Sequence, residues 1–511
     1  MSTNVVNINP GFFAHHAHFL NVFRDVMTSE AAFLHLSHDD LDGVSCGILS
    51  SLMASDMDSI NVVTEFTNQM VPETYNDIER MLYDTLSDIY NKRVAVRSVY
   101  FLITDLGGIT KDELEKRTDK VVSWAAADYK DANNIDSIQW EGDSYPVIDI
   151  NYVVIDHHQS EYMNFPKTKR EVNSSKDYFD VMCRNQIPNR IDHNDSTTLV
   201  HNTTEIIMRP DRANYRISTD MYLCDEYCAS MLYFKMLQQT ELLPKEHREM
   251  IEEYFTQVNE YDLGNQGDFL DPDTLDELED CSVTDLVGAI LTECSPQMII
   301  NAALYEISNH FKGVKDDHGG HIQFCEFVTS LMLGYPWDDY GWVMSTVKAY
   351  YDSMFIHADA DHIYKTLATV AVKELTRMTE VYDEYEECCM PVYGERLLDN
   401  SYIFTVGDST EYKKYHIRLP EKYNFIVRIY NEELPAGVNT HVFAKKCLTY
   451  ANKDGITHFD FLICTFYNKN GLYRASITAN PENGANCYTI AKLNNGGGHA
   501  GAAGFPLVPI D

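Results

Sequence analysis

Short apolar segments of strand length, alternating with segments of helical pattern, are the feature that most constrains the fold of this chain. The clearest is Val153-Val154-Ile155, which runs directly into Asp156-His157-His158, called here the acid–histidine run. A short β-branched segment of this kind predicts a strand covered on both faces, as in a parallel sheet. Because ligands of open α/β sheets bind at the carboxyl ends of the strands, we expect the acid–histidine run to line a site.

Two earlier apolar segments end in a similar way. Residues 31–37 predict a strand, which His38-Asp39-Asp40-Leu41-Asp42-Gly43 follows before a helix to about residue 53. Ser98–Thr104 predicts another strand, which stops at Asp105. Further strands are expected at 60–66 and near Val121-Val122, and helices at 73–92, 225–237 and 249–260. Strands that alternate with helices indicate an α/β fold with a mostly parallel sheet.

The length of the chain indicates more than one domain, because 511 residues exceed what one hydrophobic core usually organises. We expect the sheet domain to span residues 1–272. Within it, residues 163–220 have mixed polarity and little periodicity and are interpreted as an insertion. A helical middle region or linker is expected over 273–395. Short alternating strands over 396–511 predict a smaller C-terminal α/β domain.

The charge balance limits the partners of this chain. It has 78 acidic residues against 40 Lys and Arg, a formal net charge of −38 at pH 7. Such a chain repels long polyanions and lacks the broad basic surface that duplex binding needs, so a phosphate-bearing substrate should be short. Neither a secretory signal nor an apolar run of about 18 residues occurs, so we expect a cytoplasmic protein with no membrane partner.

The first motif has the side chains of a metal site. His38, Asp40 and Asp42 alternate, so all three can turn toward one point where the strand becomes a loop. Carboxylates with an imidazole suit Mn²⁺ or Mg²⁺. Asp105 and the acid–histidine run could complete a site for two ions about 3.5–4 Å apart. For any single acid the alternative is that it starts a turn or caps a helix after a strand.

Four motifs of the sequence resemble those of a known family. HDDLDG at 38–43, ITDLGG at 103–108, VIDHH at 154–158 and NNGGGHAGAAGF at 494–505 look like the DHH phosphoesterase superfamily with its C-terminal DHHA1 domain. Within it, the chain is most similar to the NrnB-type oligoribonucleases, or nanoRNases. The resemblance does not cover 163–220, and the helical middle region is longer than it implies.

The resemblance implies two Mn²⁺ ions, with Mg²⁺ as the alternative, and an activated water that attacks the phosphorus. The implied metal ligands are His38, Asp40, Asp42, Asp105, His157 and Asp262. Asp105 would bridge the ions, Asp156 would orient the adjacent imidazole, and His158 would face the substrate phosphate. Asp262 is assigned because Glu260-Tyr261-Asp262 follows a predicted helix, as the family's fourth motif does. Asp268 and Asp271, which are close by, are alternatives, and Asp225 is a weaker one because its helical setting indicates a surface charge.

The C-terminal motif supplies the expected substrate-binding residues. Gly496, Gly497 and Gly498 let the backbone approach an anion closely, and His499 can hydrogen-bond a phosphate oxygen. Taken alone, three glycines indicate only a flexible turn. Arg474, in the strand-like segment LYRASI, resembles the basic residue with which the family grips the terminal phosphate.

The sequence therefore predicts a Mn²⁺-dependent phosphodiesterase that hydrolyses short oligonucleotides or dinucleotides to nucleoside 5′-monophosphates. One alternative is hydrolysis of cyclic dinucleotides or another small phosphoester, such as 3′-phosphoadenosine phosphate. A non-enzymatic alternative is a protein that sequesters nucleotides or mimics nucleic acid. The choice between RNA and DNA and the oligomeric state, a homodimer included, stay open.

Overall fold

The structure is a computed structural model. It describes residues 31–55, 62–68, 73–91, 98–133, 148–158, 204–207, 215–223, 227–240, 243, 248–263, 270–278, 281–311, 319–333, 360–388, 390–392, 395–396, 401–406, 413–421, 423, 425–429, 459–467, 473–480, 485–498, 501–507 and 509–510. The chain folds into two compact units, the first formed by residues 1–259 and 307–339 and the second by residues 260–306 and 340–511. Among the described residues, no helix is both long and apolar enough to cross a bilayer.

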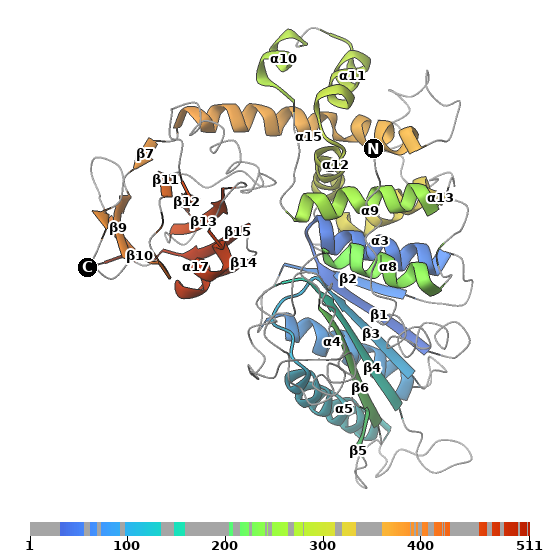
Figure 1. The fold of residues 1–511 in the computed structure, drawn as a ribbon. Coiled ribbons are helices and arrows are strands. Elements are labelled where there is room, and N and C mark those ends of the chain that lie inside the picture. The colour runs from blue at the N-terminus through green and yellow to red at the C-terminus, as the bar shows by residue number, and fades with distance from the viewer. Residues whose placement is uncertain are drawn as a thin grey trace, which may run out of the picture. The chain divides into compact units, whose positions relative to one another are not determined.

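A six-stranded sheet forms the centre of the first unit (Figure 1). Its strands, in spatial order, are β2 (Val62–Thr67), β1 (Ala31–His38), β3 (Ser98–Thr104), β4 (Ile148–Asp156), β6 (Tyr215–Leu223) and β5 (Thr204–Ile207). Every neighbouring pair is parallel except β5 with β6, so the prediction of a mostly parallel α/β sheet is confirmed.

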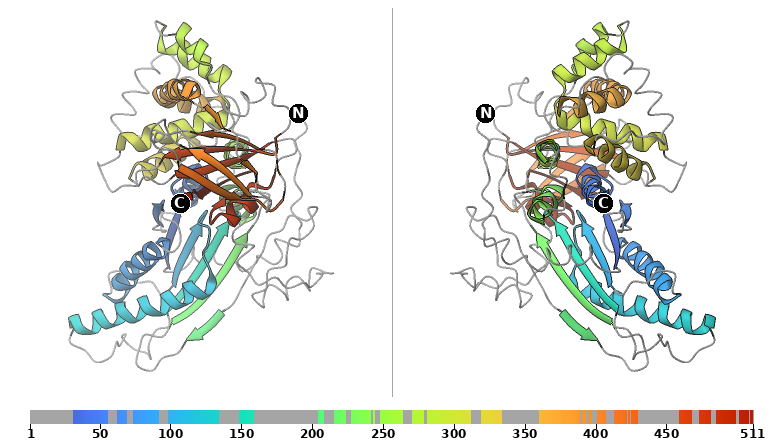
Figure 2. Two further views of the ribbon diagram at one scale, coloured as in Figure 1. Left: turned by 90° about the vertical axis from the view of Figure 1, so that its left-hand side faces the viewer. Right: turned by 90° about the vertical axis from the view of Figure 1, so that its right-hand side faces the viewer.

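Helices cover both faces of this sheet. Figure 2 shows α4 (Thr74–Tyr90) and α5 (Lys111–Asn133) along one face. Their buried apolar side chains pack in one core with Leu34 and Leu36 of β1 and with alternate residues of β3 and β4. The helices α3 (Leu41–Ser55) and α8 (Ala229–Thr240) pack side by side, and α3 also packs on β1 and β2. Burial of both faces explains why β3 lacks the alternation of a half-exposed strand.

The register of the strands sets where the motifs lie. Ser37 of β1 pairs with Thr104 of β3, and Thr104 pairs with Ile155 of β4. His38 and Asp156, the last residues of β1 and β4, therefore lie level with Asp105, which follows β3. The carboxyl edge of the sheet carries all three motifs side by side.

Two sequence predictions within this unit are wrong. Val121 and Val122 are not a strand, because they lie on the buried face of α5, where helical spacing rather than strand pairing places them against the core. Residues 163–220 are not simply an insertion, since β5 and most of β6 come from this range and β6 pairs along the whole of β4. Residues 163–203 lie outside the described residues.

The predicted helical middle region is helical in its described parts, and the two units share it. Its helices are α11 (Val283–Glu293), α12 (Pro296–Phe311), α13 (Gly319–Leu333) and α15 (Ala360–Cys388), preceded by α9 (Arg248–Asp262) and α10 (Pro272–Glu277). Within the first unit α13 packs on α3, where the thiol of Cys325 donates to the carbonyl of Val44 over 3.3 Å. Within the second unit α10 and α11 pack on α15.

The C-terminal part of the second unit contains two further sheets and the helix α17 (Cys487–Leu493). One sheet has the order β16 (Pro509–Ile510), β10 (Lys413–Arg418), β9 (Ser401–Val406) and β8 (Glu395–Arg396). The other has the order β14 (Gly497–Gly498), β15 (Ala502–Pro506), β13 (Tyr473–Ala479), β12 (Phe461–Tyr467), β11 (Phe425–Ile429) and β7 (Met390–Val392). The expected smaller C-terminal α/β part is therefore present.

The core between α5 and β4 contains a hydrogen bond that a single atom change removes. The Tyr152 hydroxyl lies 2.7 Å from Thr118 Oγ1, and Thr118 itself donates to the carbonyl of Leu114 over 2.8 Å. Tyr152→Phe should lower the free energy of unfolding by about 1 kcal/mol, the usual net value of a neutral hydrogen bond. Urea denaturation measures this change, and an unchanged or higher stability would contradict the contact.

Candidate metal centre

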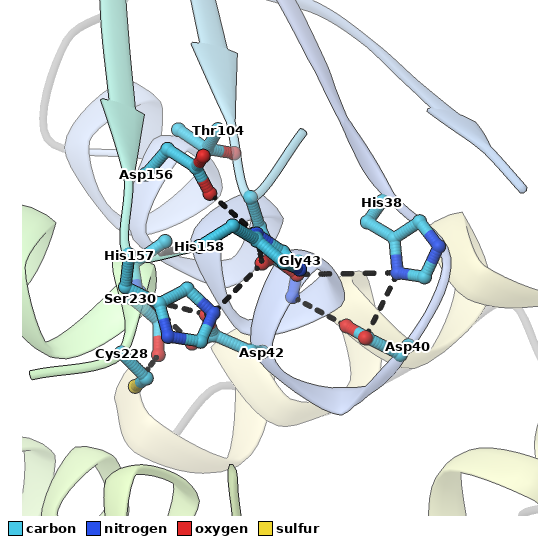
Figure 3. A network of polar contacts seen from close by, with 12 residues as sticks. His38, Asp40, Asp42, Gly43, Thr104, Asp156, His157, His158, Cys228 and Ser230 are labelled. Atoms are coloured by element: carbon cyan, nitrogen blue, oxygen red, sulfur yellow. Dashed lines mark hydrogen bonds and ion pairs between the residues drawn. The ribbon is translucent and has the colours of Figure 1, made fainter. Parts of the chain in front are cut away.

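The first motif is held in a tight loop at the end of β1 (Figure 3). His38 Nδ1 lies 2.8 Å from Asp40 Oδ2, and the backbone N–H of Gly43 donates to Asp40 Oδ1 over 3.0 Å. A side chain at position 43 would put its Cβ only 2.3 Å from the carbonyl oxygen of His38. The close approach of the helix start to the strand therefore requires glycine.

Asp42 has a structural partner as well as a place in the cluster. Its Oδ2 accepts from the N–H of Ala229 over 2.8 Å, and its Oδ1 accepts from the N–H of Ser230 over 2.9 Å. These are the first amides of α8, so Asp42 supplies the acceptor that a helix N-terminus otherwise lacks. Its Oδ2 also lies 3.6 Å from His157 Nε2.

Asp105 lies at the centre of the site. The chain leaves β3 here with φ of 55°, a left-handed conformation that aspartate tolerates better than most residues. The Asp105 N–H donates to the carbonyl of Ile155 over 2.9 Å. Its Oδ1 lies 3.1 Å from His157 Nε2, and its Oδ2 lies 4.0 Å from His38 Nδ1. One carboxylate thus presents an oxygen to each of two histidines.

The acid–histidine run contributes its three side chains differently. His157 is buried, with Nε2 toward Asp105 and Asp42, whereas His158 is one-quarter exposed. Asp156 is fully buried, and its Oδ1 accepts from His158 Nδ1 over 2.7 Å. The imidazole that Asp156 holds is therefore that of His158.

Burial and neighbouring charges adjust the pKa of several of these groups. Burial lowers the pKa of His157, which keeps the imidazole in the neutral form that binds metals. Burial alone would raise the pKa of Asp156, but the charge of His158 and its hydrogen bond outweigh it and lower that pKa. At His38 burial is outweighed by the charge of Asp40, so the pKa of His38 is raised.

Within the first unit, potential ligand atoms converge in two overlapping groups, each within 4.8 Å. The groups are Asp105 with the acid–histidine run, and His38 with Asp40 and Asp105, while Asp42 adjoins them through Oδ2, 3.6 Å from His157 Nε2. Five of the six residues predicted as metal ligands, all except Asp262, therefore lie together in the first unit. Carboxylate oxygens with two imidazoles are a donor set that fits a hard divalent cation such as Mn²⁺ or Mg²⁺. A buried oxygen of Asp156, Oδ2, has no hydrogen-bond partner among the residues that the structure describes.

Asp262 is the last residue of α9 and belongs to the second unit, so its role as a metal ligand stays a prediction. The boundary between the two units falls inside this helix, after Asn259, whose side chain accepts from the N–H of Cys228 over 2.9 Å. Of the alternatives to Asp262, Asp271 caps α10 by accepting from the N–H of Asp273. Asp225 and Asp268 lie outside the described residues.

The predicted substrate-binding residues belong to the C-terminal sheet of the second unit. Gly497 and Gly498 form β14, which pairs with β15, and a Cβ at Gly496 would lie 2.0 Å from the carbonyl oxygen of Gly504. Gly498 has φ of 132°, whereas a Cβ at Gly497 would meet no atom within 4 Å. Arg474 is exposed on β13. His499 lies outside the described residues, and phosphate binding by this group stays a prediction.

A set of buried polar residues directly beneath the cluster was not predicted from the sequence. His35 and Ser37 of β1 and Thr104 of β3 are buried and hydrogen-bonded to one another through Thr104. A signal for them exists, because polar residues occupy alternate positions around the apolar Leu34 and Leu36. In a strand covered on both faces, that spacing places the polar side chains together on one buried face.

Comparisons with known proteins give only weak likenesses. No protein-family model and no curated protein matches the sequence. Among solved structures, the chain is similar to the DHH domain of a member of the s1p family of ribosomal proteins, with 11% identity over 98% of this chain and 90% of that one and a TM-score of 0.40. It is similar to the pGpG-specific phosphodiesterase PggH of Vibrio cholerae, with 12% identity over 93% of each chain and a TM-score of 0.35. It also matches RecJ of Thermus thermophilus in complex with Mn²⁺, with 11% identity over 96% of this chain and 52% of that one and a TM-score of 0.35.

The two carboxylates of the first motif should differ in what they do for stability. In EDTA, Asp42→Ala should lower the free energy of unfolding by about 2 kcal/mol, because α8 loses the acceptor for its first amides. Asp40→Ala should cost less than about 1 kcal/mol, since its side chain is 44% exposed and pairs with His38 and the Gly43 amide within its own loop. Urea denaturation of both variants measures the difference, and equal effects would contradict the capping role.

Proposed function

We propose that this protein is a metal-dependent phosphodiesterase of the DHH type that hydrolyses short oligonucleotides to nucleoside 5′-monophosphates. The observation that carries the proposal is the position of Asp105, with one oxygen toward His157 and the other toward His38. A carboxylate between two groups of ligands is what a pair of cations needs as a bridge. Three of the four sequence motifs that resemble the family supply residues to this same cluster.

Six residues would hold the cations. His38, Asp40 and Asp105 would form one position. Asp42 and His157 would form the other, with Asp105 between the two positions, and Asp262 is added to it only from the sequence resemblance. Bound cations would lower the pKa of a water and neutralise charge on the phosphate. The fixed scaffold of strand ends would hold the ligands in place before substrate arrives, so little reorganisation is needed during the reaction.

His158 and Asp156 are proposed to act on the substrate phosphate. Asp156 accepts the Nδ1–H of His158, which fixes the ring and its tautomer, so that Nε2 would face the phosphate. The ring centroids of His158 and His157 lie 4.8 Å apart, and a phosphate held by cations near His157 would be within reach of His158. Asp156 thus supports the substrate-facing imidazole.

The length of the substrate follows from charge. A formal net charge of −38 disfavours a long polyanion, so binding energy must come from a few local contacts with the reacting and terminal phosphates. Arg474 and the glycines at 496–498 are proposed to bind the terminal phosphate. Mn²⁺ is proposed as the preferred ion because two of the ligands are imidazoles.

Substitution of the central ligands should abolish turnover. Asp105→Ala and His157→Ala should each reduce hydrolysis of a dinucleotide in Mn²⁺ by at least about 1,000-fold, because each removes a ligand from the metal centre. Asp271→Ala is the matched control, since that acid caps α10 and belongs to none of the ligand groups. Retention of substantial activity in either ligand variant would rule out the proposed centre.

The same assay separates the candidate functions. Linear dinucleotides, longer RNA and DNA oligomers, cyclic dinucleotides and 3′-phosphoadenosine phosphate should be compared at equal concentration with Mn²⁺ and with Mg²⁺. The proposal predicts the highest kcat/KM for the shortest linear substrates. Tight nucleotide binding without metal-dependent turnover would favour a sequestering protein instead.

Loss of the proposed terminal-phosphate contact should act on binding more than on chemistry. Arg474→Ala should raise KM for a 5′-phosphorylated dinucleotide about 10-fold with kcat nearly unchanged, because a charge-assisted hydrogen bond made in both ground and transition states is removed. Lys414→Ala, which removes an exposed cation from β10, is the control. An unchanged KM for the Arg474 variant would remove Arg474 from the site.

A further inference from the structure

A buried histidine lies on β1 beneath the candidate metal centre. His35 has no exposed surface, and both of its ring nitrogens have hydrogen-bond partners. Nε2 lies 2.8 Å from Thr104 Oγ1 on β3, and Nδ1 lies 3.0 Å from Ser50 Oγ on α3. The chain of contacts continues from Ser50 to the hydroxyl of Tyr233 on α8 over 3.3 Å. One imidazole therefore bridges a strand and a helix and is connected to a second helix.

On the other side of Thr104 the chain reaches the first motif. Thr104 Oγ1 lies 2.6 Å from Ser37 Oγ, and Ser37 Oγ donates to the carbonyl of Gly43 over 2.8 Å, with the Thr104 carbonyl 3.2 Å away. Each hydroxyl can donate only one hydrogen. The carbonyl of Gly43 can only accept, so it decides which atom is the donor in each bond of the series. If Ser37 donates to a carbonyl, Thr104 must donate to Ser37.

The direction of these bonds fixes the tautomer of His35. The Thr104 hydroxyl donates its only hydrogen to Ser37, so it can only accept from His35. His35 Nε2 must therefore carry a hydrogen and donate it to Thr104 Oγ1. Nδ1 is then the acceptor from Ser50, and Ser50 accepts from Tyr233. Burial lowers the pKa of His35 to about 3, which favours the neutral ring. A neutral imidazole is the form that can donate at one nitrogen and accept at the other.

Two members of this series of hydrogen bonds, Thr104 and Gly43, adjoin predicted ligands. Thr104 directly precedes Asp105. The peptide of Gly43 accepts from Ser37 through its oxygen, and the N–H of Gly43 donates to Asp40 Oδ1. A change at His35 would therefore move β3 relative to the start of α3, and with it Asp105 relative to Asp40.

We propose that His35 is a positioning residue of the metal centre, which sets the separation of Asp105 from the carboxylates of the first motif through Thr104, Ser37 and Gly43. This inference rests on the proposed function in so far as it requires a metal centre at these residues. An apolar side chain could fill the same space between β1 and α3. The histidine adds two directional bonds, and polar partners behind metal ligands typically change metal affinity by about 10–100-fold when removed.

The test is the affinity for Mn²⁺, measured by calorimetric titration without substrate. His35→Phe keeps a ring in the space and removes both hydrogen bonds, and it should weaken Mn²⁺ binding by about 10-fold or more. Tyr152→Phe is the matched control, because it removes a buried hydrogen bond on the opposite face of the same sheet. The control should lose stability while it keeps the Mn²⁺ affinity of the unsubstituted protein.

Two further variants separate positioning from packing. Thr104→Val has the same shape without the hydroxyl and should weaken Mn²⁺ binding about as much as His35→Phe, and the double variant should be no weaker than either single one. His35→Gln can still donate to Thr104 and should recover most of the affinity. If all of these variants bind Mn²⁺ within about twofold of the unsubstituted protein, His35 is a packing residue and the inference fails.

A measurement on the unsubstituted protein covers the case in which His35→Phe does not fold. With ¹⁵N-labelled histidine and Mg²⁺ in place of Mn²⁺, one histidine should be neutral with the proton on Nε2 from about pH 5 to 9. A His35 that titrates in this range, or that carries its proton on Nδ1, would overturn the chain of bonds. If the protein binds no Mn²⁺ at all, the metal centre itself is wrong and the inference falls with it. Mn²⁺ binding without phosphodiesterase activity would instead reject only the proposed reaction.

Discussion

Repulsion between carboxylates brought together at the ends of parallel strands is the constraint on which the rest of the first unit depends. Asp40, Asp42, Asp105 and Asp156 all lie at one edge of the sheet because β1, β3 and β4 end in register. Neighbouring groups offset part of this negative charge. The first amides of α8 donate to Asp42, His38 pairs with Asp40, and His158 donates to Asp156. A divalent cation would offset more of it at the place where Asp105 faces both histidines.

Holding such charges in place requires rigid support, and much of that support is polar and buried. The chain from Tyr233 through His35 and Thr104 to Gly43 connects α8, α3, β1 and β3 beneath the cluster. On the opposite face the sheet packs against α4 and α5 through an apolar core. The face of the sheet toward α4 and α5 therefore stabilises the unit by burying apolar surface. The face toward α3 and α8 adds hydrogen bonds that fix the positions of the ligands. The same division explains why His35 and Ser37 lie on the α3 side of β1 while Leu34 and Leu36 face α4 and α5.

The sequence predicted the strands that carry the motifs because their apolar segments are short and each ends in an acid. Prediction failed where a local pattern had two meanings. Val121-Val122 is a β-branched pair, yet its spacing with Leu114 and Ala125 places it on the buried face of a helix. Residues 215–223 mix Arg, Ser, Thr and Asp among apolar residues, so they lack the pattern of a buried strand although β6 pairs with β4. The carboxylates could be assigned to one site from their positions after strands, whereas the Asp42–α8 contact joins residues far apart in the chain.

Electron paramagnetic resonance of the Mn²⁺-loaded protein tests the central claim most directly. If Asp105 bridges two cations about 3.5–4 Å apart, the protein should take up two Mn²⁺ per chain and show the spectrum of an exchange-coupled pair. The hyperfine pattern of isolated Mn²⁺, or uptake of a single ion at saturation, would contradict the account of Asp105 as the residue that joins the two groups of ligands.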